Sequence, residues 1–438
     1  MSATIFTIKR SEIEGRLDPE FYNPKYFKIF KNEKSNWIRL NSIVKTLKHP
    51  PEYKRIFVEN GYQLIRSQNV RPLGINLDEN PVYLANEIVN NSSSIFPKKN
   101  DILIVRSGVN AGDVAVVEED FPNTTVGADT LLLNVTDEVL PKFVQIYFFS
   151  DVGRNQLNRY LTGATNKHIN SFSIKRVYFP KLDLQKQKQC INLFETSLFQ
   201  KEQKQQQAKQ LLDSIDSYLL DELGIKLPQK DNSLSKRIFT TKFSEVSGGR
   251  WDPFWQISQK NKMKSNNFSE FKVKELANIQ KGESITSDEI KEGKFPVIAG
   301  GKTSPYSHNV SNFNGNVITI SASGAYSGYV WYHKRPIFAS DCSVLTSLDE
   351  SNCTTLFLYE VLHLKQEELY NLQQGAGQPH VYPADIAEIK IPLPPLPKQK
   401  EIASHIREIR EQAKQLQVEA DKTMQEAKKQ IEKMILGE

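Results

Sequence analysis

The spacing of apolar residues divides the chain into β-like and helical stretches. Between Trp37 and Val177, short alternating apolar runs are broken by Gly, Asn and Pro, which predicts strands joined by turns. Similar runs return in the second half, whereas segments 141–149 and 356–362 have a helical pattern. The predicted class is therefore α+β, with two similar β-rich domains. The runs assigned to strands are 62–66, 101–105, 113–117, 130–135, 295–298, 316–320 and 328–332.

Two longer stretches carry apolar residues at alternating intervals of three and four, which predicts two long helices with one apolar seam each. The first follows the capping residue Asp183 and ends at Gly224, and the second follows Pro397 and ends at Gly437. Each helix would be about 60 Å long, at about 1.5 Å per residue, so one small domain cannot bury its seam. We expect the two to pair as an antiparallel coiled coil; pairing between two copies of the chain is the alternative. The predicted seam positions are Ile191, Phe194, Leu198, Lys201, Gln205, Ala208, Leu212, Ile215 and Leu219 in the first helix, and Ile402, Ile406, Ile409, Ala413, Leu416, Ala420, Met424, Ala427, Ile431 and Met434 in the second.

A duplicated segment joins each β-rich half to the helix that follows it. Residues 163–169 (GATNKHI) and 375–381 (GAGQPHV) lie 212 positions apart. The same interval separates Pro180 from Pro392, so a loop, a strand and a helix start recur in register. This register indicates an internal repeat. Further matched pairs are Gln187 with Gln399, Ser107-Gly108 with Ser323-Gly324, and Arg16-Leu17-Asp18-Pro19 with Arg250-Trp251-Asp252-Pro253.

The repeat and the helices together predict the domain boundaries. Residues 1–180 form the first β-rich domain, 181–224 the central long helix, and 225–240 a linker. The second β-rich domain covers 241–396, and 397–438 form the C-terminal helix that pairs with the central one.

The amino-acid composition limits the possible functions only slightly. The 438 residues include 57 Lys and Arg against 51 Asp and Glu, a mildly basic balance that permits a polyanionic partner without requiring one. The three cysteines form no C-x-x-C pair, which argues against a disulfide framework and a zinc site. The first residues lack the pattern of a signal peptide, and no apolar run is long enough for a membrane span. We therefore expect a cytoplasmic protein.

Polar and cationic side chains gather in the loops of both β-rich halves. Arg binds guanine edges, Asn and Gln suit adenine, and Lys, Ser and Thr hold phosphates, so these loops are candidates for contact with double-stranded DNA. Two such domains held apart by a rod would suit two half-sites. The candidates in the first domain are Tyr53, Lys54, Arg55, Arg66, Gln68, Asn69, Arg71, Arg106, Asn110, Thr165, Asn166, Lys167 and His168; those in the second are Lys281, Ser284, Lys302, Thr303, Tyr306, Ser323, Tyr326, Gln378 and His380.

A search for catalytic motifs finds none. Gly300-Gly301-Lys302-Thr303 lacks the earlier glycine of a phosphate-binding loop, and Ser107-Gly108 is not a nucleophile elbow. His168 and His380 have no acidic partner nearby in sequence, so a hydrogen-bonding role is favoured over that of a general base. There is no cofactor fingerprint and no amino-methylation motif. The chain is predicted to be non-catalytic and to bind no metal.

The closing segment 391–402 (IPLPPLPKQKEI), the Arg-x-Asp-Pro segments and the two β-rich halves with their long helices resemble the specificity (S) subunit of type I restriction-modification systems. The resemblance implies two target-recognition domains, each binding half of a bipartite DNA sequence, with the paired helices setting the spacer. It also implies two methylation subunits that bind S-adenosylmethionine, and restriction subunits that use ATP and Mg to translocate and cleave DNA. This chain would itself bind no cofactor.

Two other classes of function stay open at the level of the sequence. One is a non-enzymatic coiled-coil adaptor whose β-rich domains bind proteins or glycans. The other is an enzyme whose active site is too dispersed to be recognised from motifs.

Overall fold

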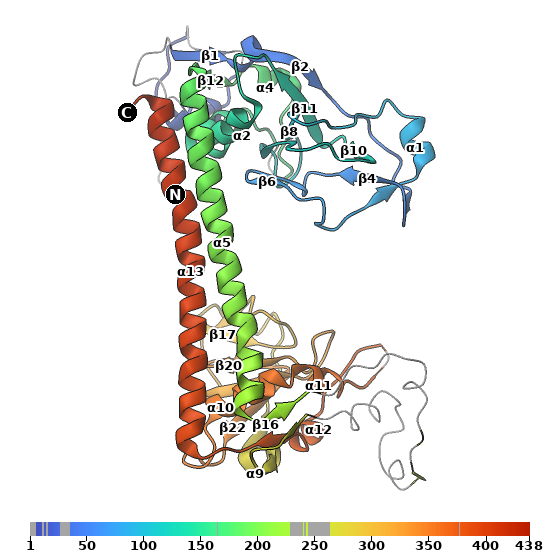
Figure 1. The fold of residues 1–438 in the computed structure, drawn as a ribbon, viewed down its shortest axis with the longest axis vertical. Coiled ribbons are helices and arrows are strands. Elements are labelled where there is room, and N and C mark those ends of the chain that lie inside the picture. Colours follow the sequence, from blue (N-terminus) through green and yellow to red (C-terminus); the bar gives the residue numbers. More distant parts are fainter. Residues whose placement is uncertain are drawn as a thin grey trace. The chain divides into compact units, whose positions relative to one another are not determined.

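We describe a computed structural model of the chain, covering residues 6–10, 13–14, 16–26, 36–163, 165–227, 240, 242–243, 263–375 and 377–438. The chain divides into two compact units. The first comprises residues 1–206 together with 416–438, and the second comprises 207–415. The segment 250–255, which repeats the Arg-x-Asp-Pro motif, lies outside the described residues. Helices and strands are present in both units, which confirms the predicted α+β class (Figure 1).

The first unit is built on a sheet in the order β2-β11-β8-β9. A second sheet, β10-β4-β7-β3, and the pairs β1-β12 and β5-β6 complete its strands. Helix α2 packs on the first sheet through β9 and β8. The strands are β1 (Trp37–Arg39), β2 (Val44–Lys48), β3 (Phe57–Val58), β4 (Tyr62–Ile65), β5 (Val70–Arg71), β6 (Gly74–Ile75), β7 (Tyr83–Leu84), β8 (Ile102–Val105), β9 (Val114–Val116), β10 (Thr124–Val126), β11 (Thr130–Val135) and β12 (Tyr178–Pro180). The short helices are η2 (Pro19–Tyr22), η5 (Leu40–Ile43), α1 (Asn86–Asn90), α2 (Pro141–Phe149), α3 (Asp151–Asn158) and α4 (Ser171–Lys175).

The second unit has its main sheet in the order β16-β22-β19-β20. Smaller sheets β18-β17-β21, β15-β23 and β13-β14 accompany it, and α10 packs on β20 and β22. The strands are β13 (Ile225–Lys226), β14 (Lys264–Ser265), β15 (Glu270–Lys272), β16 (Ala277–Lys281), β17 (Phe295–Ile298), β18 (Ser307–His308), β19 (Val317–Ser321), β20 (Val330–His333), β21 (Phe338–Ala339), β22 (Cys342–Ser347) and β23 (Lys390–Pro392). The helices are α9 (Val273–Leu276), α10 (Thr355–Leu364), α11 (Gln366–Tyr370) and α12 (Pro383–Ala387).

Two long helices, α5 (Leu184–Glu222) and α13 (Leu396–Leu436), contribute to both units. Asp183 caps α5 by accepting a hydrogen bond from the Lys186 amide at 2.8 Å, as expected of a residue just before a helix. The predicted seam of α13 is buried or half-buried throughout. The seam predicted for α5 is wrong at two places, because Gln205 and Leu212 are exposed.

Each unit has one large apolar core that includes parts of both long helices. In the first unit, Cys190 and Phe194 of α5 share a core with Met424, Ile431 and Ile435 of α13. In the second unit, the core contains the later part of α5 and the earlier part of α13. The α5 residues in that core are Ile215 and Leu219, and the α13 residues are Ile402, Ile406 and Ile409. Burial of these side chains, at about 25 cal/mol per Å² of apolar surface, ties the helices to the sheets.

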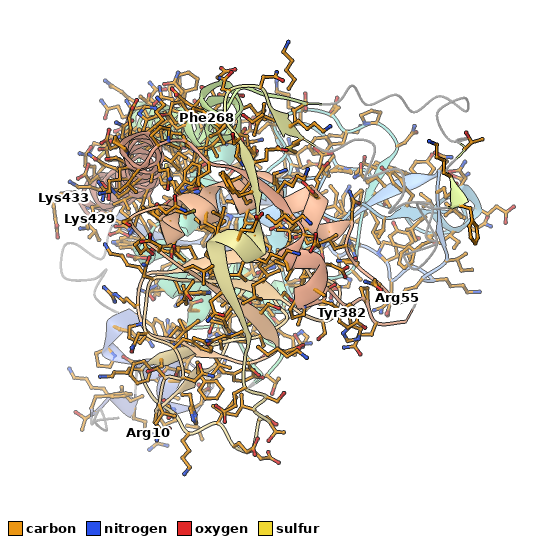
Figure 2. The ribbon with its side chains drawn as sticks, turned by 90° about the horizontal axis from the view of Figure 1, so that it is seen from below. Arg10, Arg55, Phe268, Tyr382, Lys429 and Lys433 are labelled. Carbon is orange, nitrogen blue, oxygen red and sulfur yellow. The ribbon has the colours of Figure 1, made fainter. Side chains whose placement is uncertain are left out.

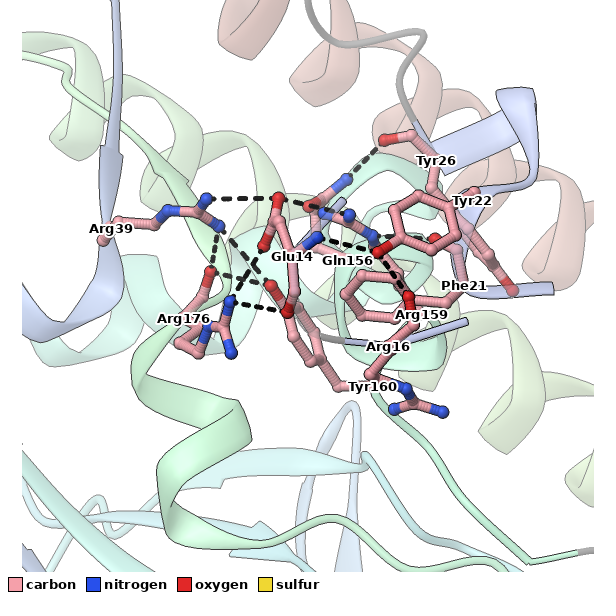
Figure 3. Close-up of polar contacts among 10 residues, drawn as sticks. All are labelled: Glu14, Arg16, Phe21, Tyr22, Tyr26, Arg39, Gln156, Arg159, Tyr160 and Arg176. Carbon is pink, nitrogen blue, oxygen red and sulfur yellow. Dashed lines mark hydrogen bonds and ion pairs between the residues drawn. The ribbon is translucent and has the colours of Figure 1, made fainter. Parts of the chain in front are cut away.

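An ion-pair cluster fixes the N-terminal segment to the first unit (Figure 3). Asp18 accepts a hydrogen bond from the Phe21 amide at 3.1 Å and starts the short helix η2, and Phe21 is buried. Nearby, the Glu14 carboxylate forms ion pairs at 3.3–3.4 Å with Arg39, Arg159 and Arg176. In this copy of the Arg-x-Asp-Pro motif, the short helix therefore begins at Pro19, and its aromatic residues Phe21 and Tyr22 are buried.

Candidate nucleic-acid interface

In the first unit, a glycine-rich loop after β8 holds the polar tip of the duplicated segment. The Gly108 amide donates a hydrogen bond to the Lys167 carbonyl at 3.1 Å, and the Ile169 amide donates one to the Arg106 carbonyl at 2.8 Å. Ser107 forms a β-bridge with His168, and the Ser107 hydroxyl bonds the Asp129 carboxylate. Residues 106–112 and 165–168 therefore form one surface although they are distant in sequence.

The second unit contains the same arrangement of a glycine-rich loop bonded to the duplicated segment, which we call the loop frame. The Gly324 amide donates to the Pro379 carbonyl at 3.0 Å, and the Val381 amide donates to the Ala322 carbonyl at 3.0 Å. Ser323 forms a β-bridge with His380, and its hydroxyl bonds the Asp341 carboxylate.

Backbone conformation explains why glycine begins both copies of the duplicated segment. Gly163 and Gly375 have φ values of +94° and +103°, in the region that side-chain-bearing residues rarely adopt. A Cβ atom at Gly163 would also lie 2.1 Å from the Asn166 carbonyl oxygen, and one at Gly375 would lie 2.7 Å from that of Gln378. The tight turn that presents each polar tip thus requires glycine.

The candidates on the tip of the first unit are exposed. Thr165, Asn166, Lys167 and His168 all present their side chains to solvent. Lys54 and Arg55 are also exposed, and neither forms an ion pair with another described residue; Arg55 is labelled in Figure 2. Asn110 is half-buried in the glycine-rich loop.

Five other candidates in the first unit use their polar groups inside the protein. The buried Tyr53 hydroxyl bonds that of Thr125 at 2.7 Å, and Asn69, only 2% exposed, donates to the carbonyls of Asn76 and Glu79. Because their polar atoms are already satisfied in the interior, Tyr53 and Asn69 are corrected from DNA-contacting to structural residues. The other three are bonded but partly accessible: Arg66 to the Asn80 carbonyl, Gln68 to the Glu79 carbonyl, and Arg71 to Glu79 and Asp113.

Arg106 has a neighbour that the candidate list from the sequence did not include. Its guanidinium group bonds the Nε2 atom of His49, which must accept this hydrogen bond and is therefore neutral in this arrangement. Partial burial, together with the charge of Arg106, lowers the pKa of His49 from its usual value. The Nε atom of Arg106 is buried without a protein partner among the described residues.

The candidates of the second unit lie on neighbouring loops. Two of these loops pack closely at Gly300, where a Cβ atom would lie only 2.6 Å from the Ser323 carbonyl oxygen. The loop after β16 packs on the same region, since the Gly282 amide donates to the Cys342 carbonyl at 2.8 Å. The exposed candidates are Lys281, Ser284, Lys302, Thr303, Tyr306, Tyr326 and Gln378, and the half-buried ones are Ser323 and His380.

Three tyrosines beside these candidates were missed from the sequence. Tyr382 is 48% exposed and its ring stacks on that of His380 at a centroid distance of 6.2 Å (Figure 2). Tyr329 is half-buried, with its ring 5.6 Å from the Lys302 ammonium group, and Tyr370 is also half-buried. The only signal in the sequence was the density of aromatic residues near the loops.

Several titratable groups of the described residues lie in the interior. The three cysteines are buried free thiols, and burial raises the pKa of Cys190 to about 11 and those of Cys342 and Cys353 to about 12. Burial lowers the pKa of His333 to about 4, so this imidazole is neutral at pH 7. Within the described ranges, no group of His, Cys, Asp and Glu residues could hold a metal ion. None of the helices described combines the length and apolarity that a membrane crossing requires.

Comparison with known proteins identifies the class. A sequence profile described as the type I restriction modification DNA specificity domain matches residues 265–420. This segment is therefore similar to the DNA specificity domain of type I restriction-modification systems. The match confirms the resemblance found in the sequence.

Individual relatives agree with the profile match. The specificity subunit of the type I restriction enzyme MpnII from Mycoplasma pneumoniae is 32% identical over 143 residues, which cover 31% of this chain and 42% of that protein. The specificity subunit of MjaVIII from Methanocaldococcus jannaschii is 36% identical over 92 residues, covering 20% and 21%. The match thus spans less than half of either relative. A solved chain from a study of complex assembly and conformational transition of the type I R-M system superposes with a TM-score of 0.54 at 14% identity, covering 91% of this chain and 96% of that one, and supports the fold.

Proposed function

We propose that this chain is the DNA-recognition subunit of a type I restriction-modification complex, and that each unit binds one half of a bipartite DNA target. The observation that carries the proposal is the repeated frame of loops. In both units, a serine bonded to an aspartate and a bridged histidine support an exposed polar tip. Two such surfaces with different side chains suit two different half-sites.

The internal repeat is part of the proposal. The main sheets, β2-β11-β8-β9 and β16-β22-β19-β20, have the same order of strands along the chain. The pairs β1-β12 and β15-β23 also correspond, which supports a duplicated domain. We keep the predicted boundaries: recognition domains at 1–180 and 241–396, a linker at 225–240, and helices at 181–224 and 397–438.

We further propose that α5 and α13 pair antiparallel and act as the ruler between the half-sites. Two ion pairs support the direction. Lys204 of α5 bonds Glu419 of α13 at 3.0 Å in the first unit, and Glu222 at the end of α5 bonds Lys398 at the start of α13 at 2.5 Å in the second. Two methylation subunits would dock on the paired helices.

The chemistry would reside on partner subunits. In this proposal, the methylation subunits bind S-adenosylmethionine and methylate adenine, and the restriction subunits use ATP and Mg. The chain itself contributes DNA contacts through the exposed cations and amides of its loops. Because phosphate neutralisation dominates non-specific affinity, binding should weaken steeply with added salt.

Sequencing of methylated adenines tests the proposal. Cells that carry the partner subunits are compared with and without this chain. The expected result is a bipartite methylated motif that appears only when the chain is present. An unchanged methylation pattern, with the methylation subunits shown to be active with another specificity subunit, would refute it.

A further inference from the structure

The two units present different chemistry on the same frame. In the second unit, two tyrosines lie beside Lys302, whose ammonium group is 4.7 Å from the ring centroid of Tyr326 and 5.6 Å from that of Tyr329. Tyr370 lies next to Tyr329, because a Cβ atom at the neighbouring Gly328 would be 3.4 Å from the Tyr370 amide nitrogen. Burial, followed by the proximity of Tyr329 and Tyr326, raises the pKa of Tyr370. We call Lys302, Tyr326, Tyr329 and Tyr370 the tyrosine cluster.

The equivalent positions of the first unit carry no aromatic residue. Tyr326 and Tyr329 lie 216 positions after Asn110 and Asp113, the interval that also separates Ser107-Gly108 from Ser323-Gly324. Tyr370 lies 212 positions after Asn158. Tyr382, beside His380, corresponds to Asn170. The cluster is therefore not needed to build the loop frame.

An ion pair occupies this place in the first unit. Arg154 bonds Asp113 at 2.7 Å, and a Cβ atom at Gly112 would lie 3.3 Å from the Arg154 guanidinium group. At the position of Arg154, the second unit has Gln366, which bonds the backbone at Val330 and Gly328. The second unit thus has aromatic rings where the first has a salt bridge.

The rings of the cluster are available to a ligand. Tyr326 is 46% exposed, Tyr329 and Tyr370 are half-buried, and within the described part of the chain none of their hydroxyl groups is bonded to another protein group. Tyr306, 58% exposed, lies on the loop that carries Lys302. Aromatic faces next to a cation are the chemistry that binds nucleobases whose faces are free. A base inside a regular duplex offers no free face, so stacking requires an opened step.

We propose that the second unit stacks the tyrosine cluster on a base that has left the duplex stack, with Lys302 positioned for the neighbouring phosphate. The inference rests on the proposed function and gives its second half-site a specific chemistry. Recognition there would combine base contacts with local opening of the DNA, whereas the first unit would bind a stacked duplex. The difference follows from the tyrosines and their polar counterparts on one shared frame.

An abasic-site scan tests this proposal with the full chain in complex with its methylation subunits. Each nucleotide of both half-sites is replaced in turn by an abasic residue, and affinity is measured by fluorescence anisotropy for the wild type, Tyr326→Leu and Tyr326→Phe. Because one stacked base contributes about 1–3 kcal/mol, Tyr326→Leu should weaken binding of the intact target about 5- to 150-fold. Tyr326→Phe, which keeps the ring, should bind like the wild type.

The decisive measurement is whether the effects of Tyr326→Leu and of the abasic residue on affinity depend on each other. At one position of the second half-site, the abasic residue should weaken wild-type binding but should not weaken Tyr326→Leu further. An abasic residue on the opposite strand should tighten wild-type binding, because the base is already unpaired. No such position is expected in the first half-site.

Three outcomes would overturn the inference. These are independent effects of Tyr326→Leu and the abasic residue at every position, equal losses in Tyr326→Phe and Tyr326→Leu, or the same coupling in the first half-site. Each is compatible with specific binding of both half-sites by the wild type, so the proposed function would survive. If the wild type does not prefer its target over random duplex, the proposed function itself fails.

Discussion

At the scale of single residues, Glu14 shows how one carboxylate organises several cations. Its side chain is 20% exposed and lies among Arg39, Arg159 and Arg176. Burial would raise the pKa of Glu14, but the charges of Arg159 and Arg39 and their hydrogen bonds outweigh it and hold the pKa below its usual 4.5. Without this carboxylate, three guanidinium groups would face one another.

Glu14→Gln should therefore destabilise the first unit by about 2 kcal/mol, since it removes one charge from a partly buried ion cluster. Urea unfolding followed by hydrogen exchange of peptides measures the effect, and the second unit serves as internal control. Glu20→Gln is the matched variant on the same segment: Glu20 forms an exposed ion pair with Lys25 and accepts a hydrogen bond from the Tyr26 hydroxyl at 2.8 Å. Because the glutamine carbonyl can still accept that hydrogen bond, the change in stability should stay within about 0.5 kcal/mol. Equal effects of the two variants would contradict the assigned role of Glu14.

The difference in stability between the wild type and Glu14→Gln should depend on pH, and the pKa of Glu14 gives its sign. Because the folded pKa of Glu14 is below 4.5, its stabilisation is complete above that pH and is lost as the pH falls through the folded pKa. The difference in stability between wild type and Glu14→Gln should be constant from about pH 5 to 7 and shrink below about pH 4.5. A difference that grows on acidification would be inconsistent with this cluster.

At the scale of secondary structure, a buried glutamine attaches each long helix to its unit. Gln187 in the first turn of α5 accepts a hydrogen bond from the Leu140 amide and donates to the carbonyls of Glu138 and Leu182. Gln399 in α13 accepts from the Thr354 amide and donates to Asn352 and Pro394. Leu140 and Thr354 are the N-cap residues of α2 and α10, so the same joint occurs in both units.

Gln187→Leu should destabilise the first unit by about 2–4 kcal/mol, because it leaves buried backbone groups without partners. Gln399→Leu should act equally on the second unit. Thermal unfolding with hydrogen exchange assigns each loss to its unit. The exposed neighbour Lys188 provides the control, and Lys188→Leu should change stability by less than about 0.5 kcal/mol. If Gln187→Leu destabilised the second unit instead, or Gln399→Leu the first, these glutamines would not be the attachment points.

The sequence predicted the helices well and the role of particular residues less well. Asp183 and Gly224 mark where α5 begins and ends because capping is a local property. Gln187 was recognised as part of the repeat but not as a buried residue, since its neighbours are Lys and Gln. Leu212 was placed on the seam by its apolarity, yet it is 39% exposed. Burial of polar residues such as Asn69 depends on tertiary contacts that periodicity does not contain.

At the scale of the whole molecule, the proposed ruler makes a quantitative prediction. Deleting 201–207 from α5 and 416–422 from α13 removes one heptad from each helix around the Lys204–Glu419 ion pair. The rod shortens by about 10 Å, equal to about three base pairs, so the spacer of the methylated motif should shorten by about three while both half-sites stay the same. Methylation sequencing reads out both quantities.

A deletion of four residues from each helix provides the control. It disrupts the alternating spacing of the seam, so specific methylation should be lost rather than shifted. A change in the half-sites with an unchanged spacer would show that the helices do not measure distance.

The first unit is built from two segments that are separated in sequence by the whole second unit, so the ribosome makes them at different times. Its core contains Met424, Ile431 and Ile435, which are translated after residues 207–415, whereas the rest of that core is translated before them. The first unit must therefore wait, incomplete, while residues 207–415 of the second unit are translated. A premature stop codon after residue 415 would keep all residues of the second unit and expose the apolar interior of the first unit.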